Sequence, residues 1–136
     1  MEKIVGGCLC GAVRYRSSAQ PVTTWLCQCE QCQRQSGSAF SLNVGFAKGS
    51  LEYTGDQPGT YAHKGGSGLT VHRHFCRKCG SPVMTELDIT PGLDWLKSGT
   101  LDDKSWLKPD VSIWEHDGQP WLTLPAGIQA FDRNPP

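Results

Sequence analysis

The sequence is 136 residues long, and its 13 Lys and Arg residues balance its 13 Asp and Glu residues, so the formal net charge is zero. This length suits one domain, and the lack of a basic excess argues against a general nucleic-acid binder, which needs cations to contact phosphates. Hydrophobic residues make up 38% of the chain and charged residues 19%, a composition that argues against a disordered protein.

Short segments of alternating apolar and polar residues predict β-strands along the chain. They lie at residues 13–16, 39–46, 69–75, 82–87 and 111–114. Glycine-containing segments that predict turns separate them, at residues 48–50, 54–56, 65–68 and 117–120. Only residues 29–35 are expected to form a short helix, which Ser36 and Gly37 would end. This pattern predicts a mainly β fold with an antiparallel, coiled or barrel-like sheet.

The N-terminal residues Met1 to Gly7 contain no apolar stretch of signal-peptide length. No segment approaches the roughly 18 consecutive apolar residues that a membrane-spanning helix needs. A chain without an export signal normally stays in a reducing compartment, where thiols remain free or bind metal. We therefore expect a cytoplasmic protein with neither a membrane nor a nucleic acid as partner.

The seven cysteines are the most informative residues, and their odd number means that disulfides alone cannot use them all. They form three clusters: Cys8 and Cys10; Cys27, Cys29 and Cys32; and Cys76 and Cys79. The two residues between Cys76 and Cys79 let both sulfurs face one ion. Gly80, directly after them, suits a tight backbone whose amides can donate hydrogen bonds to thiolates.

The number of sulfurs limits how they can be shared between metal ions. The simplest pairing joins the two clusters of two cysteines into one closed tetrahedral site, which leaves three cysteines for a second site with one open position. Closed sites are structural, whereas three protein ligands with an open position are typical of catalytic zinc. Zinc is the expected ion, with an iron–sulfur cluster as the alternative. Buried free thiols or a redox C-x-x-C motif are the interpretations without metal.

Four segments around and after the cysteines share a pattern with a known family. They are GCLCGAVRY at residues 7–15, CQCEQCQRQSGSAF at 27–40, RHFCRKCGS at 73–81 and GTLDD at 99–103, followed by Pro109, Ile113, Trp114, Pro120 and Trp121. In these segments the chain resembles the glutathione-dependent formaldehyde-activating enzyme (GFA) family, which also includes centromere protein V. The resemblance covers about residues 6–131, so we expect a single GFA-type domain spanning residues 1–136.

The resemblance implies a zinc-ribbon-derived, coiled β fold called the β-tent, with two Zn²⁺ ions per chain. It implies a structural zinc on Cys8, Cys10, Cys76 and Cys79, and a catalytic zinc on Cys27, Cys29 and Cys32. One departure is Gln28, because the family often has His at this position. Since position 28 lies between two ligands, we expect the change to affect hydrogen bonding around the metal rather than metal loading.

The resemblance also implies a carbon–sulfur lyase that acts on a thiol–aldehyde adduct such as S-hydroxymethylglutathione. A thiol that binds an open zinc position loses its proton readily, although the free pKa of a thiol is about 8.5. Its sulfur could then form or break a hemithioacetal bond to an aldehyde. The expected partner is therefore a small-molecule thiol or its aldehyde adduct.

Beyond the zinc ligands, the sequence offers three candidate substrate-binding residues and assigns no catalytic acid or base, for which Glu30 is the nearest candidate. Glu30 lies between the ligands, and Arg34 and Ser36 could bind a carboxylate of a glutathione-like molecule. The alternative function is a zinc-stabilised binding domain without turnover, in which both ions are structural. A fourth protein ligand at the three-cysteine ion would favour this alternative, whereas an open position would favour the enzyme. A redox switch would instead form reversible disulfides.

Overall fold

Residues 4–136, which the computed structural model describes, form eleven β-strands, one α-helix and two short 3-10 helices. The strands are β1 (Val5–Gly7), β2 (Arg14–Ser17), β3 (Thr23–Cys27), β4 (Ser41–Ala47), β5 (Leu51–Tyr53), β6 (Gly59–Lys64), β7 (Thr70–Phe75), β8 (Pro82–Leu87), β9 (Leu93–Lys97), β10 (Val111–Ile113) and β11 (Gln129–Ala130). The helices are α1 (Glu30–Ser36), η1 (Ser98–Thr100) and η2 (Glu115–Asp117). Within this range no helix has the length and hydrophobicity that crossing a bilayer requires. The predicted mainly β fold with one short helix is confirmed.

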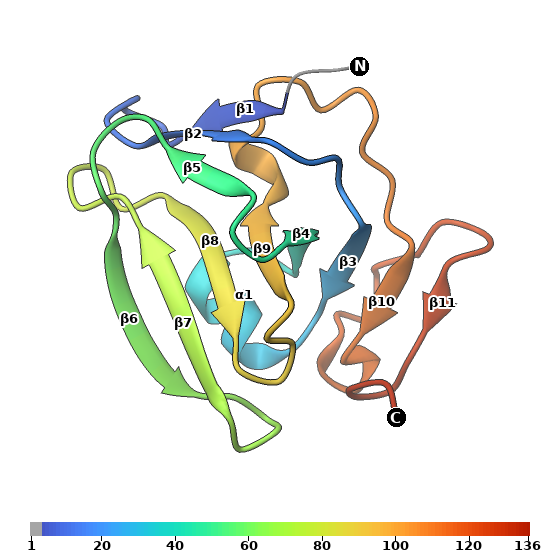
Figure 1. Cartoon of the computed structure of the whole chain (residues 1–136). Helices are drawn as coiled ribbons and strands as arrows, with labels where there is room; N and C mark the ends of the chain where they lie inside the picture. Colours follow the sequence, from blue (N-terminus) through green and yellow to red (C-terminus); the bar gives the residue numbers. More distant parts are fainter. Residues whose placement is uncertain (1–3) are drawn as a thin grey trace.

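The strands form two sheets. Strands β1, β2 and β5 make a small sheet, and the other eight make a large sheet in the order β11-β10-β3-β4-β9-β8-β7-β6. Figure 1 shows the large sheet curving from β6 at one edge to β11 at the other, with the small sheet near its upper end. All neighbours are antiparallel except β10, which runs parallel to both β3 and β11. The long chain segment between β3 and β10 permits the crossover that parallel pairing needs.

Alternation along the central strands gives the large sheet two different faces. On β4, Val44 and Phe46 are fully buried and belong to the hydrophobic core, whereas Asn43 projects from the opposite face. On β9, Leu96 belongs to the core, and Lys97 shares the face of Asn43, its direct partner in the register. The same strands therefore supply an apolar core on one side and a polar surface on the other.

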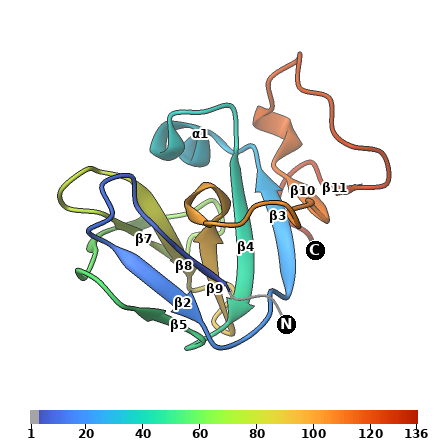
Figure 2. The ribbon, with the colours of Figure 1, turned by 90° about the horizontal axis from the view of Figure 1, so that it is seen from above.

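The core lies between the small sheet and one face of the large sheet. Tyr15 from β2 is buried against it, and its hydroxyl shares a hydrogen bond of 2.8 Å with Thr100 Oγ1. Figure 2 shows that the large sheet separates the small sheet from α1. The face of the large sheet that does not contribute to the core is therefore the one on the side of α1.

Hydrogen bonds cap both ends of helix α1, through a side chain at its start and through the backbone at its end. The backbone N–H of Cys32 donates to the Cys29 sulfur at 3.3 Å, which caps the first turn. Gly37 follows the last turn with a φ of 66°, and its N–H donates to the carbonyl of Gln33. A left-handed residue at this place is typical of a helix end and favours glycine. The predicted helix end at Ser36 and Gly37 is confirmed.

Candidate metal centres and the adjoining cavity

Four cysteines from two distant parts of the chain meet beside the small sheet. Cys8 and Cys10 follow β1, and Cys76 and Cys79 lie in the turn between β7 and β8. Their four sulfurs all lie within 4.8 Å of one another. The Cys10 and Cys76 sulfurs are 3.8 Å apart, although these residues are separated by 66 positions. This group could hold a metal ion and would tie β1 to the β7–β8 turn.

The backbone around this cluster donates hydrogen bonds to its sulfurs. The N–H of Val13 donates to Cys8 Sγ at 3.3 Å, and the N–H of Lys78 donates to Cys76 Sγ at 3.4 Å. Gly80 permits the tight turn, since its φ of 78° lies in the left-handed region and its N–H donates to the Cys76 carbonyl. Such donors stabilise thiolates, which are the form that binds metal.

The surroundings of these thiols shift their acidities in opposite directions. Hydrogen bonds from the Ser81 hydroxyl and backbone lower the pKa of Cys79 to about 5. The pKa of Cys10 rises to about 11, because desolvation and its neighbours Cys8, Cys79 and Cys76 outweigh a stabilising hydrogen bond from the Ala12 backbone. A thiophilic divalent ion would remove this mutual repulsion, so the donor set fits a tetrahedral metal site.

The remaining three cysteines meet where β3 leads into α1. Cys27 ends β3, Cys29 caps α1, and Cys32 lies in its first turn, with the three sulfurs within 4.8 Å of one another. Hydrogen bonds from Cys27 and Cys29 hold the pKa of Cys32 well below its usual value. Hydrogen bonds with Cys29 and Cys32, together with burial, raise the pKa of Cys27. Among residues 4–136, no fourth Cys, His, Asp or Glu belongs to this group, which could hold a metal ion with three protein ligands.

The three-cysteine cluster lines a cavity of about 480 Å³ on the face of the large sheet that lies toward α1. Trp25 from β3 and Trp95 from β9 form part of its wall, with ring centroids 5.5 Å apart. Leu87 and Ile89 contribute further apolar surface. The cavity therefore places a cluster of thiols beside a wall that can bind an apolar group.

Two buried cations face the same cavity. Lys97 is 7% exposed and Arg73 is 5% exposed, and both line the cavity. Burial lowers the pKa of Lys97, and the Cys32 thiolate partly offsets this effect. Arg73 donates a hydrogen bond of 2.8 Å from Nε to Nε2 of His63. Among residues 4–136, no Asp or Glu side chain lines the cavity, although the carboxyl-terminal residue Pro136 does, so the cysteines are the acidic side chains that face these cations.

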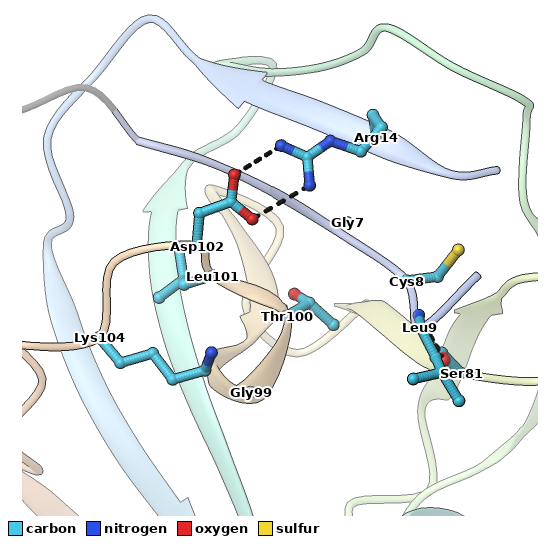
Figure 3. A pocket seen from close by; sticks show the side chains of 10 residues that line it. All are labelled: Gly7, Cys8, Leu9, Arg14, Ser81, Gly99, Thr100, Leu101, Asp102 and Lys104. Atoms are coloured by element: carbon cyan, nitrogen blue, oxygen red, sulfur yellow. Dashed lines mark hydrogen bonds and ion pairs between the residues drawn. The ribbon is translucent and has the colours of Figure 1, made fainter. Parts of the chain in front are cut away.

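A second cavity, of about 550 Å³, lies beside the four-cysteine cluster (Figure 3). In Figure 3 Arg14 and Asp102 point toward each other, and both oxygens of the carboxylate accept hydrogen bonds from the guanidinium, at 3.0 and 2.6 Å. The N–H of Leu9 donates to Ser81 Oγ at 3.1 Å. Because these groups already have partners, the cavity beside the three-cysteine cluster is the better candidate for a functional site.

The cysteine clusters and the fold that joins them agree with a comparison with protein families. The family described as glutathione-dependent formaldehyde-activating enzyme matches residues 3–117. The chain belongs to this GFA family. The resemblance in the cysteine motifs is thereby confirmed.

A solved structure shares the fold of this GFA-family chain. It is the crystal structure of a Rhodobacter sphaeroides protein, with a TM-score of 0.58 and 20% sequence identity. The similarity covers 77% of this chain and 91% of that one. None of the curated proteins matches the chain.

The structure places the other predicted site residues of the GFA domain outside the cavity. Glu30 and Arg34 form an ion pair of 3.0 Å on the exposed side of α1. Ser36 Oγ donates to the carbonyl of Cys32 at 2.7 Å, inside the helix. Their substrate-binding roles stay predictions. Gln28 is buried, and its amide donates to Ser112 Oγ at 3.1 Å, which links the three-cysteine segment to β10.

Sequence reasoning did not single out the buried residues that face the three cysteines. Lys97, Arg73, Asn43 and Thr85 come from four different strands and line the same cavity. Only Asn43 lies between two apolar neighbours, Leu42 and Val44, and this is also the pattern of a solvent-exposed strand face. The pairing of the strands decides between the two interpretations, and the sequence pattern does not contain it.

Proposed function

We propose that this GFA-family protein is a zinc-dependent carbon–sulfur lyase acting on a thiol–aldehyde adduct similar to S-hydroxymethylglutathione. In the synthetic direction the thiol sulfur adds to the aldehyde carbon, and the thiol proton ends on the aldehyde oxygen. The reverse direction breaks the carbon–sulfur bond and returns the proton to sulfur. Neither direction requires an oxidant or a reductant. The observation that carries this proposal is the three-thiol cluster that opens into a cavity.

The proposal assigns different roles to the two cysteine clusters. Cys8, Cys10, Cys76 and Cys79 would hold a structural zinc, and Cys27, Cys29 and Cys32 would hold a catalytic zinc. When bound by three thiolates, zinc supplies a thiophilic position that lowers the pKa of an incoming thiol and polarises a carbonyl. A site with three anionic ligands is a weak Lewis acid for hydrolysis, so chemistry at sulfur suits it better.

The surrounding side chains would favour the ionised form of the substrate thiol. Lys97 and Arg73 are buried next to the thiol cluster and stabilise negative charge in a region of low dielectric. Trp25 and Trp95 would cover the reacting group and keep water away from it. These residues bind and orient the thiol rather than exchange a proton with it.

The proposal includes the setting in which the protein acts. None of the seven cysteines is in a disulfide, and a reducing cytoplasm keeps cysteines available to bind metal. We therefore place a single catalytic domain, residues 1–136, in the cytoplasm. Its partner would be a small-molecule thiol or the aldehyde adduct of that thiol, with neither a nucleic acid nor a membrane involved.

The test is the exchange of formaldehyde with its glutathione adduct, followed by carbon-13 NMR with labelled formaldehyde. We expect the zinc-loaded protein to accelerate exchange above the spontaneous rate, and Cys29→Ser to lose this acceleration. Ser18→Ala, which changes an exposed residue that does not line the cavity, is the control and should retain it. If glutathione neither perturbs the three-cysteine site nor exchanges faster than in buffer, the domain is a non-catalytic binding domain instead.

A further inference from the structure

We propose that Trp114 is a specificity-determining residue that forms, together with Trp25 and Trp95, an aryl-binding subsite beside the three cysteines. The ligand would be a small thiol with an aromatic body, or the aldehyde adduct of that thiol. The inference rests on the proposed function for the adduct alone, because the preference for an aromatic body follows from the wall of the cavity.

Apolar side chains line the cavity without being fully buried. Trp25, Ile113 and Trp114 are half-buried, and Ile89 is 48% exposed. Apolar surface that stays accessible inside a concave site is typical of a ligand-binding pocket. The cavity volume of about 480 Å³ lies within the range of about 300–1,000 Å³ that small-molecule sites have. The cavity therefore fits a small molecule with an apolar body.

The three tryptophans of this wall offer ring surface rather than hydrogen bonds to a ligand. An indole has one hydrogen-bond donor, its N–H group, and no acceptor. In Trp25, Trp95 and Trp114 this N–H already donates to a side-chain oxygen of the protein. The acceptors, in the same order, are Thr23 Oγ1 at 2.9 Å, Thr90 Oγ1 at 3.0 Å and Asn134 Oδ1 at 2.8 Å. Since aromatic rings pack on one another edge to face or offset, an aryl group is the ligand that matches this wall.

The register of the strands places the wall next to the thiols. Trp25 lies two residues before Cys27 on β3, so both side chains point to the same face of the sheet, about 7 Å apart along the strand. Ile113 on β10 pairs directly with Cys27, and Trp114 follows Ile113. A ligand whose sulfur lies at the three cysteines can therefore reach the tryptophans with an aryl group one or two carbon atoms from that sulfur.

Trp114 has a backbone conformation that a bulky residue rarely adopts. Its φ of 60° lies in the left-handed region, and within residues 4–136 it is the only residue other than glycine with a positive φ. Its N–H donates to the carbonyl of Arg133 at 3.3 Å, and its carbonyl accepts from the N–H of Asp117 at 3.2 Å. Strained backbone persists where the surrounding structure imposes it, and it is concentrated at functional sites. The conformation therefore supports a role for Trp114 in the cavity that it lines.

The indole of Trp114 also connects the two ends of the large sheet. It lies against Gly66, in the loop between β6 and β7, and a Cβ atom at position 66 would be 2.7 Å from Cζ2 of the indole. Figure 1 shows this loop and the C-terminal segment at the same lower end of the molecule. Gln31 of α1, the neighbour of Cys32, donates to the Lys64 carbonyl at 3.1 Å and so ties β6 to the three-cysteine helix. The glycine thus permits the close approach that holds the indole at the wall of the cavity.

The experiment measures equilibrium binding to the zinc-loaded protein by titration calorimetry. The thiol probes are benzyl mercaptan, cyclohexylmethanethiol and 2-mercaptoethanol, and the thiol-free probes are benzyl alcohol and 1-propanol. We expect benzyl mercaptan to bind at least about 10-fold more tightly than 2-mercaptoethanol, because its ring leaves water for the tryptophan wall. It should also bind more tightly than cyclohexylmethanethiol, which has similar bulk but no aromatic ring. Benzyl alcohol should bind more tightly than 1-propanol.

Variants test whether Trp114 provides this preference. Trp114→Leu removes the aromatic ring, Trp114→Phe keeps one, and Gly66→Ala places a methyl group where the indole lies. Circular dichroism and zinc content check that each variant is folded and loaded. Trp114→Leu and Gly66→Ala should each weaken the binding of benzyl mercaptan at least about 5-fold and leave that of 2-mercaptoethanol unchanged, whereas Trp114→Phe should retain most of the affinity. Trp121→Leu, which changes a tryptophan that is 68% exposed and does not line the cavity, is the matched control and should change neither.

The outcomes separate this inference from the proposed lyase activity. Equal affinity for benzyl mercaptan and cyclohexylmethanethiol, or an aryl preference that survives in folded Trp114→Leu, would overturn the subsite. Because benzyl alcohol has no thiol, its binding and the loss of this binding in Trp114→Leu would support the subsite even if no carbon–sulfur chemistry is detected. An active lyase without a preference for aryl thiols would instead refute the subsite and leave the proposed function intact.

Discussion

Loss of one cysteine from the four-cysteine cluster should cost the fold more than loss of one from the three-cysteine cluster. Cys10 and Cys76 are 66 positions apart, so a metal that joins them closes a long loop. The loop-closure expression for a cross-link gives about 4 kcal/mol for this length and about 2 kcal/mol for the short loop from Cys27 to Cys32. Domains of this size are stable by only about 5–15 kcal/mol. Cys76→Ser should therefore bring the protein close to unfolding, whereas Cys32→Ser should leave it folded.

The assay is urea unfolding of zinc-loaded protein, followed by tryptophan fluorescence, for wild type, Cys76→Ser and Cys32→Ser. The midpoint should fall for both variants and fall further for Cys76→Ser. Wild type treated with a chelator is the control, since it loses both cross-links and should be the least stable form. If Cys32→Ser destabilises the protein as much as Cys76→Ser, the division into a structural and a catalytic site is wrong.

Three further substitutions test the fold. The hydrogen bond from Lys48 holds the pKa of Glu86 below its usual value. This ion pair therefore stabilises the fold above about pH 4.5, and the stabilisation is lost as the pH falls through the pKa that Glu86 has in the folded protein. Lys48→Met should cost about 1 kcal/mol in urea unfolding at pH 7 and less at pH 3, and an equal cost at both would contradict this. Gly37→Val should lower stability by about 1–2 kcal/mol, since a β-branched residue does not tolerate its positive φ; an unchanged melting temperature would refute this. Tyr15→Phe removes a buried hydrogen bond to Thr100 and should cost about 1 kcal/mol in thermal unfolding, whereas a gain in stability would show that the bond is not needed.

The strands that the sequence predicts are those whose residues alternate in type, and they include β4 although most of that strand is buried. Strand β9 is also buried on both faces, but its residues do not alternate in type. Leu96 packs in the core, Asp94 is buried and pairs with Lys48, and Lys97 faces the cavity, so the segment shows no clean alternation. A period of two is visible only where residue type alternates along the strand.

The two cysteine groups that could hold metal ions could be predicted because ligands from one turn lie at short, fixed spacings. The buried residues around them could not, since they come from strands that meet only through the register of the sheet. Glu30 and Arg34 were singled out for their closeness to the cysteines in sequence, and the structure places them in an exposed ion pair. Closeness in sequence therefore located cysteines that could hold a metal ion, whereas the cavity depends on long-range pairing.

The most direct test of the account is metal analysis of protein purified without chelator, combined with the absorption spectrum. The two cysteine clusters predict two zinc ions per chain and a colourless protein for wild type, and one zinc ion per folded chain for Cys29→Ser. One ion or none in wild type, the visible absorption of an iron–sulfur cluster, or an unchanged zinc content in Cys29→Ser would contradict the assignment of a second, catalytic zinc to Cys27, Cys29 and Cys32.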